Sequence, residues 1–369
     1  MAAIVRSARF RRLARAAALL ALSTLVVDSA VAPARAQSGA PSAAPCDIRT
    51  TERVVAIGDV HGAHARFVEL LRTVRLIDQR DRWIGNRAIL VQTGDILDRG
   101  ADSRKTLDLL RRLERDADQA GGKVYALLGN HEVMRMIRDW RYVSAGEYAA
   151  FRRADSADTR DRVYEAALAQ AEESARADKR RLDVNAFRDQ FMKDVPLGAI
   201  EMRQAFSSDG EYGRWLRTHV AMVQINGVAF VHGGVSPALA SLGCAGINAA
   251  VAKDLAEPSP TLAQGLAMFS SQESGPLWYR GLVTEPETLT PQVPAVLRAL
   301  GVRAMVVGHS VSSTLRVATH YEGRVIQIDT GMLGGAVYRN GQPSALEIVG
   351  ETFTAVYLNS RDALPTPQP

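Results

Sequence analysis

The sequence predicts an α/β fold, and three features of its middle section support that prediction. Short apolar runs alternate with segments of helical spacing, the pattern of strands joined by crossover helices. Several of these runs end in a glycine-containing motif that also holds an aspartate, an asparagine or a histidine. Between two groups of such runs lies a long stretch rich in Ala, Glu and Arg, which favours helix. We therefore expect parallel strand pairing and a separate helical insertion.

The first 36 residues have the pattern of a cleaved secretory signal peptide. Arginines precede the apolar stretch AAALLALSTLVV (16–27), which is shorter than the roughly 20 residues of a membrane span. Small residues follow and end in an A-x-A cleavage pattern at 34–36. The arginine pair at 11–12 leaves a twin-arginine export route open. We expect an exported protein, periplasmic or secreted, that is not held in the membrane after cleavage.

The positive net charge of the chain comes entirely from residues 1–36. Residues 1–36 hold six arginines and one aspartate, so the formal net charge of +5 falls to zero without them. A basic surface for nucleic acid is therefore not expected. Residues 37–50 are small, polar and proline-containing, which predicts a linker or arm. The only cysteines, Cys46 and Cys244, could form a disulfide in an oxidising compartment or stay as thiols, and the sequence leaves both open.

The main domain is expected over residues 51–358, and it opens with a strand–helix–strand–helix–strand unit. The second helix of this unit places Leu107, Leu110 and Leu113 on one face, as an amphipathic helix should. The expected strands are 53–59, 88–95 and 123–130, and the expected helices are 65–77 and 103–117.

The rest of the chain divides by composition. Residues 140–218 predict the helical insertion, and a further helical stretch is expected over 246–300. Two strands should form a hairpin at the turn Asn226-Gly227. A strand at 303–309 precedes a run of antiparallel strands, and the proline-rich tail 359–369 is expected to be disordered.

Five short motifs each follow an expected strand. Ligands of open α/β sheets lie beyond the carboxyl ends of the strands, so the polar residues of these motifs should converge. The glycines would let the backbone turn sharply and approach a bound group closely. The motifs are GDVHG (58–62), GDILDRG (94–100), GNHE (129–132), VHGG (231–234) and VGH (307–309).

The residue types in these motifs suit divalent metals. Carboxylate, imidazole and amide oxygen are ligands for ions such as Mn, Fe or Zn. Six candidates are too many for one catalytic ion with open positions, which favours two ions that share an aspartate, an arrangement suited to in-line displacement at phosphorus. Asp98 could then orient an imidazole, and Arg99 could grip a phosphate dianion. The six candidates are Asp59, His61, Asp95, Asn130, His232 and His309.

At these residues the chain resembles the calcineurin-like metallophosphoesterases, and more narrowly the phosphoprotein phosphatase superfamily. LLGNHEVM (127–134), PLWYRG (276–281) and MVVGHS (305–310) bring it closest to the Shewanella-like phosphatases. The resemblance spans roughly residues 51–350. It implies a four-layer α/β/β/α sandwich with two mixed sheets, to which the helical insertion is added.

The resemblance also implies the role of each site residue. One ion would be held by Asp59, His61 and Asp95, and the other by Asp95, Asn130, His232 and His309. His131 would be the general acid, paired with Asp98. Arg99 would bind the substrate phosphate together with Arg280, for which a surface salt bridge is the alternative. Manganese is the expected ion, with iron or zinc as alternatives.

One region departs from the eukaryotic pattern. The SAPNYC-type loop is absent, and residues 325–338 read VIQIDTGMLGGAVY in its place. Asp329 to Gly331 would either close the floor of the pocket or simply end a strand.

The expected function is that of an exported, metal-dependent phosphatase that hydrolyses phosphomonoesters with a hydroxide activated by two metals. Its partner would be a protein or peptide phosphorylated on tyrosine or on serine and threonine. A first alternative is a small-molecule phosphatase for nucleotides or dinucleoside polyphosphates. A second alternative is a non-catalytic binding module on a phosphatase fold. The metal content of the purified protein distinguishes it from an enzyme, because such a module would contain almost no metal.

Overall fold

The computed structural model describes residues 46–257, 259, 261–285 and 292–367. The expected signal peptide and most of the expected arm therefore lie outside the described residues. The described chain forms two compact units: Tyr148–Gln204 is one, and the residues before and after it form the other. None of the helices within the described ranges is long and apolar enough to cross a membrane.

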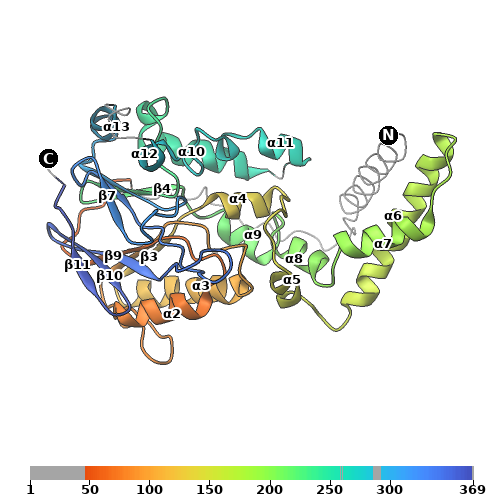
Figure 1. The fold of residues 1–369 in the computed structure, drawn as a ribbon, viewed down its shortest axis with the longest axis horizontal. Helices are drawn as coiled ribbons and strands as arrows, with labels where there is room; N and C mark the ends of the chain where they lie inside the picture. Colours follow the sequence, from red (N-terminus) through yellow and green to blue (C-terminus); the bar gives the residue numbers. More distant parts are fainter. Residues whose placement is uncertain (1–45, 258, 260, 286–291, 368–369) are drawn as a thin grey trace. The chain divides into compact units, whose positions relative to one another are not determined.

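The larger unit contains two mixed sheets, which confirms the predicted fold class (Figure 1). The first sheet has the order β11-β10-β9-β1-β2-β3, with parallel pairing among β1, β2 and β3 and antiparallel pairing elsewhere. Its strands are β1 (Val54–Ile57), β2 (Ile89–Gln92), β3 (Lys123–Ala126), β9 (Ser344–Val349), β10 (Thr352–Tyr357) and β11 (Arg361–Ala363).

The second sheet has the order β4-β5-β6-β8-β7. Strands β5, β6 and β8 are parallel, whereas β4 and β7 pair antiparallel at the two edges. The expected run of antiparallel strands near the C-terminus is therefore split: β7 and β8 join this sheet, and β9 and β10 join the other. The strands are β4 (Met222–Ile225), β5 (Val228–Val231), β6 (Ala304–Val307), β7 (Ala318–His320) and β8 (Val325–Gln327).

The two sheets share one core. Val54 and Phe353 of the first sheet belong to the same buried cluster as Phe230 and Val306 of the second. Helix α3 buries the predicted leucine face against the first sheet, while α10 contacts β4 of the second. Helices, sheet, sheet and helices thus form four layers. The helices of this unit are α2 (His64–Thr73), α3 (Ser103–Gln119), α4 (Asn130–Met136), α9 (Glu211–Leu216), α10 (Gly243–Ala256), α11 (Leu262–Leu266), α12 (Gly281–Thr284) and α13 (Val293–Leu300), with short 3₁₀ turns at Ala240–Leu242 and Phe269–Ser271.

Residues 140–218 are helical, as their composition predicts. Within the smaller unit, Val163 and Ala167 pack against Phe187 and Phe191 in an apolar cluster of their own. Asp183 caps the second of the two packed helices by accepting a hydrogen bond from the N–H of Ala186. The helices are α5 (Ala145–Ala150), α6 (Ser156–Ala177), α7 (Val184–Asp194) and α8 (Ala199–Ala205), followed by α9.

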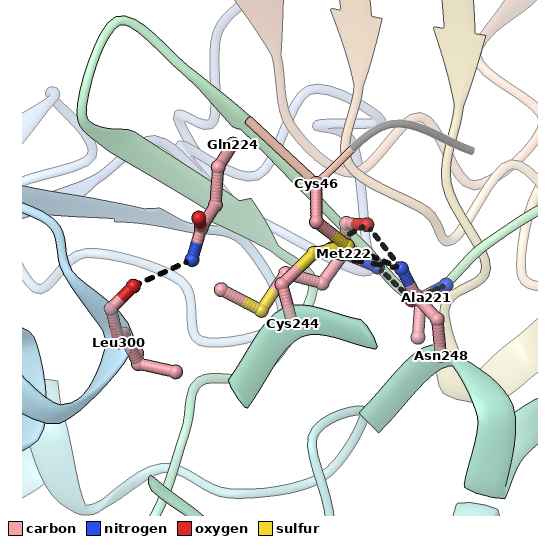
Figure 2. Close-up of a disulfide and its surroundings, with 7 residues drawn as sticks. All are labelled: Cys46, Ala221, Met222, Gln224, Cys244, Asn248 and Leu300. Atoms are coloured by element: carbon pink, nitrogen blue, oxygen red, sulfur yellow. Dashed lines mark hydrogen bonds between the residues drawn. A yellow bond between two sulfur atoms is a disulfide. The ribbon is translucent and has the colours of Figure 1, made fainter. Parts of the chain in front are cut away.

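A disulfide joins Cys46 to Cys244, which settles the choice that the sequence leaves open. It ties the arm to α10, and the arm then runs along β4, the edge strand of the second sheet (Figure 2). The N–H of Ile48 donates to the carbonyl of Gln224 at 2.9 Å, and the N–H of Asn226 donates back to Ile48 at 2.8 Å. The arm therefore covers an edge that would otherwise expose unpaired backbone groups.

The C-terminal segment is a correction to the sequence prediction. The prolines of residues 359–369 predict disorder, but Arg361–Ala363 form β11 at the edge of the first sheet. The prolines all follow this strand, so they do not interrupt its pairing.

A candidate dinuclear metal site

The six predicted metal ligands come together beyond the carboxyl ends of the strands. Asp59 and His61 follow β1, and Asp95 follows β2. The other three come from the first residue of α4 and from the ends of β5 and β6. All six are buried, with at most 6% of any residue exposed: Asp59, His61, Asp95, Asn130, His232 and His309.

Unusual backbone conformations aim these side chains inward. The φ angles of His61, Asp95 and His309 are 47°, 57° and 63°, in the left-handed region that non-glycine residues avoid. Such conformations cost about 1–3 kcal/mol each and are concentrated at functional sites. Gly129 allows a close approach as well, because a Cβ atom there would collide with the Asp95 carboxylate.

Asp95 lies at the centre of the cluster. Its Oδ2 is 3.6 Å from Nε2 of His61, and its Oδ1 is 3.3 Å from Nε2 of His232. It therefore belongs to two groups of potential ligand atoms, one with His61 and His131 and one with His232 and His309. Asn130 completes the second group, since its Oδ1 is 2.9 Å from Nε2 of His232.

Backbone carbonyls fix the orientation of two of the histidines. Nδ1 of His61 donates to the carbonyl of Leu97 at 2.8 Å, and Nδ1 of His232 donates to the carbonyl of Thr93 at 2.9 Å. Because Nδ1 carries the proton in each of these bonds, Nε2 faces the cluster as the atom available to a metal.

His309 provides the best test of whether the site fits a cation. Its Nε2 is buried and has no hydrogen-bond partner among the described residues. Burial, reinforced by the charge of His232, lowers the pKa of His309 to about 3, so the ring is neutral and offers a lone pair. An orphaned imidazole nitrogen beside two carboxylates is a set of groups that a divalent ion would satisfy.

The electrostatics of His232 support the same reading. Burial lowers its pKa, but the charge of Asp95 and a hydrogen bond to it outweigh burial and raise the pKa to about 9. The buried carboxylates of Asp59 and Asp95 thus stabilise a positive charge close to His232. The residues present fit two ions: Asp59, His61 and Asp95 could hold one, and Asp95, Asn130, His232 and His309 the other.

A histidine–aspartate pair and an arginine border the cluster. Nδ1 of His131 is 2.6 Å from Oδ2 of Asp98, and both residues are buried. The Arg99 guanidinium reaches Nε2 of His61 at 2.8 Å and Nε2 of His131 at 3.3 Å. It also lies between the rings of Tyr142 and Tyr338, at 5.5 Å and 5.4 Å from their centroids.

The structure also brings Arg280 to the site. Its Nη1 donates to the carbonyl of His309 and to Oγ of Ser310, each at 2.9 Å. It does so without an acidic partner of its own among the ion pairs of the described residues. Its role as a second phosphate-binding arginine stays a prediction.

Comparison with known proteins places the chain in a family. The family model of the calcineurin-like phosphoesterases matches residues 52–313. The chain belongs to this family. It is a metal-dependent phosphoesterase, in agreement with the resemblance seen in the sequence.

Individual relatives of this phosphoesterase carry related names. "Shewanella-like protein phosphatase 1" of Plasmodium berghei is 24% identical over 316 residues, which cover 85% of this chain and 76% of that protein. "Shewanella-like protein phosphatase 2" of Arabidopsis thaliana is 47% identical over 93 residues, 25% of this chain and 24% of the plant protein, so that match spans about a quarter of its length. The solved cold-active protein-tyrosine phosphatase of a psychrophilic Shewanella species is 26% identical with a TM-score of 0.64, over 87% of this chain and 82% of that chain.

The candidate site includes a carboxylate for which the sequence predicts no role. Glu132 is fully buried and accepts backbone N–H groups from two loops. Oε2 accepts from Gly129 and Asp95, each at 2.8 Å, and Oε1 accepts from Ile96 at 2.9 Å and Leu97 at 3.3 Å. Glu132 therefore ties the GDILDRG and GNHE loops together.

A second carboxylate, that of Asp329, interacts with Asp59. Asp329 is 1% exposed, and its Oδ1 accepts the N–H of Gly331 at 2.9 Å. Burial and the charge of Asp59 raise the pKa of Asp329 well above its ordinary value. The Asp329–Gly331 segment is therefore buried next to Asp59.

Proposed function

We propose that this phosphoesterase is a phosphoprotein phosphatase that hydrolyses phosphomonoesters at a dinuclear metal centre. The observation that carries the proposal is the position of Asp95 between two groups of buried ligand atoms, with Arg99 and His131 beside them. The names of its relatives support the phosphoprotein substrate.

The proposed ligands are the six residues predicted from the sequence, divided into two sets that share Asp95. Two divalent ions bound there would lower the pKa of a water molecule and draw charge from the phosphoryl oxygens. Manganese is the proposed ion, with iron or zinc as alternatives, because nitrogen and oxygen donors are compatible with all three.

Arg99 is the proposed phosphate-binding residue. Its planar guanidinium matches two oxygens of a phosphate group, and the rings of Tyr142 and Tyr338 restrict the orientation of that plane. Arg280 is proposed as the second such residue, from the side of His309.

His131 is the proposed general acid. The bond from its Nδ1 to Asp98 leaves Nε2 directed toward Asp95 and Arg99, at 3.7 Å and 3.3 Å. A proton on Nε2 could therefore reach the oxygen of a leaving group on a phosphate held by Arg99. Burial raises the pKa of Asp98, but the charge of Arg135 and the hydrogen bond from His131 lower it below its ordinary value, so the carboxylate stays ionised.

We also propose that the protein is exported. The pattern of residues 1–36 supports this, and so does the disulfide, which persists in oxidising compartments. The experiment below distinguishes a phosphotyrosine substrate from a phosphoserine or phosphothreonine substrate.

The experiment is metal-dependent hydrolysis by the protein from residue 37 onward. A phosphotyrosine peptide, a phosphothreonine peptide and a nucleotide would be compared with manganese and with chelator. We expect chelator-sensitive release of phosphate from a peptide, and its loss in Arg99→Ala. Activity on the nucleotide alone would move the function to small-molecule phosphates, and a protein that retains no metal and releases no phosphate would contradict the proposal.

A further inference from the structure

Arg135 is a charged side chain in an unusual place. It lies near the end of α4, is 1% exposed and is among the largest fully buried side chains of the described residues. Its guanidinium lies 5.6 Å from the ring centroid of Trp140 and 5.0 Å from that of Phe206. An arginine is almost never fully buried unless its charge is paired.

Two buried acids pair this charge. Nη2 of Arg135 donates to Oδ1 of Asp98 and, at 3.2 Å, to Oε1 of Glu147. The same oxygen of Glu147 accepts the N–H of Asp98 at 3.1 Å. Arg135 and Glu147 therefore hold Asp98 by its side chain and by its backbone.

The two oxygens of Asp98 have separate partners. Oδ1 is taken by Arg135, and Oδ2 is 2.6 Å from Nδ1 of His131. The backbone of Asp98 has a φ of 70°, so the loop alone does not favour this position. With one oxygen fixed, the other can face only Nδ1 of His131, and Nε2 is then turned toward Asp95 and Arg99.

Stability gives no reason for this arrangement. Desolvating two carboxylates and a guanidinium is so costly that apolar residues of similar volume often serve a core equally well. Trp140 and Phe206 already provide apolar walls for such a residue. The ion cluster needs another explanation, and its direct contact with the His131–Asp98 pair supplies one.

We propose that Arg135 is a positioning residue for catalysis: it fixes Asp98 so that His131 presents Nε2 to the leaving group. The proposal rests on the proposed function, in which His131 donates a proton to that group. Arg135 does not touch the substrate, so its effect should pass entirely through Asp98 and His131.

Leaving groups of different basicity test this directly. A phenol leaves with a pKa near 10 and needs a proton less than an alkyl alcohol does. In the metal-loaded enzyme, Arg135→Met should reduce kcat on a phosphoserine peptide about 10- to 100-fold and on an aryl phosphate by much less. His131→Asn should show the same selectivity, with a loss at least as large.

A double-mutant cycle separates positioning from a merely structural role. If Arg135 acts through His131, Arg135→Met adds little further loss when His131→Asn is already present. Additive losses, or equal losses on both substrates, would overturn the proposal. Metal content and thermal melting of each variant show whether the site and fold persist.

Two further variants keep the test sharp. Arg217→Met makes the same change at a half-buried arginine that binds backbone carbonyls, and should leave the ratio of the two kcat values unchanged. If Arg135→Met does not fold, Arg135→Gln keeps a polar side chain but removes the charge that pairs with Asp98, and a wild-type ratio in that variant would reject the proposal. If His131→Asn itself shows no leaving-group selectivity, the general-acid assignment fails, and this inference fails with it; if only the Arg135 variants lack selectivity, the inference alone fails.

Discussion

The loops that follow the strands of the first sheet and those that follow the strands of the second carry similar ligand residues. The two sets of loops position these residues in different ways. After β2 and β3, the carboxylate of Glu132 accepts four backbone N–H groups, and Leu97 of the same region orients His61. After β5 and β6, the pKa of His232 is raised to about 9 although burial opposes this, whereas burial lowers that of His309 to about 3. Among the described residues, Nε2 of His309 has no partner at all.

The two halves of the site are therefore completed by different means. The chain's own hydrogen bonds organise the half on the first sheet. The half on the second sheet contains a bare imidazole nitrogen, and an ion is the partner that would satisfy it. Each of the following substitutions tests that contrast.

Asp95→Asn should have the largest effect, because Asp95 belongs to both groups of potential ligand atoms. The amide keeps the shape of the side chain but removes the negative charge that both ligand groups share. We expect both ions to be lost on dialysis and phosphate release to fall by about 10³-fold or more. Metal analysis gives the number of bound ions, and kcat gives the loss of activity.

Asp118→Asn, on the exposed end of α3 where Asp118 pairs with Lys123, is the control and should change neither the metal content nor kcat. Retention of both ions by Asp95→Asn would argue against a shared carboxylate.

Substituting one histidine from each half should have a smaller and unequal effect. His61→Leu and His309→Leu should each leave a single ion and lower activity by about 10²-fold. The remaining ion should bind more tightly in His309→Leu, by about tenfold, because the preformed half still holds it. Calorimetric titration of the chelated variants with manganese gives both affinities. Equal affinities would show that the two halves are prepared to the same degree.

Sequence patterns located the candidate site well because its parts are local. GDVHG, GDILDRG and GNHE each follow a strand within a few residues, so the rule that ligands lie beyond strand ends was enough to gather Asp59, Asp95 and Asn130. The two sheets were harder to foresee. Strands β7 and β8 lie between β6 and β9 in sequence, and only the packing of the core decides which sheet each one joins.

The supporting residues were missed for a different physical reason. Glu132 is part of the GNHE motif, but its role depends on backbone N–H groups more than 30 positions away. Glu147 lies 49 residues from Asp98, inside a stretch whose composition indicates an exposed helix. A carboxylate surrounded by backbone N–H donors, or a buried ion cluster, leaves no periodic signal in the sequence, so neither could be predicted before the loops were placed.

The smallest expected effect is on the stability of the metal-free protein. It tests directly whether the half on the first sheet is preformed, because no ion contributes to the measurement. In Glu132 each oxygen accepts two N–H groups, but the amide of Glu132→Gln has only one oxygen. Its NH₂ group would face the other pair of donors, leaving two buried N–H groups unpaired. We expect the free energy of unfolding of the chelated protein to fall by about 3 kcal/mol, measured in denaturant. His309→Leu removes a nitrogen that has no partner to lose, so the same measurement should change by less than about 1 kcal/mol. If the two substitutions destabilise the metal-free protein equally, the first half is no more preformed than the second, and the contrast between them arises only when ions bind.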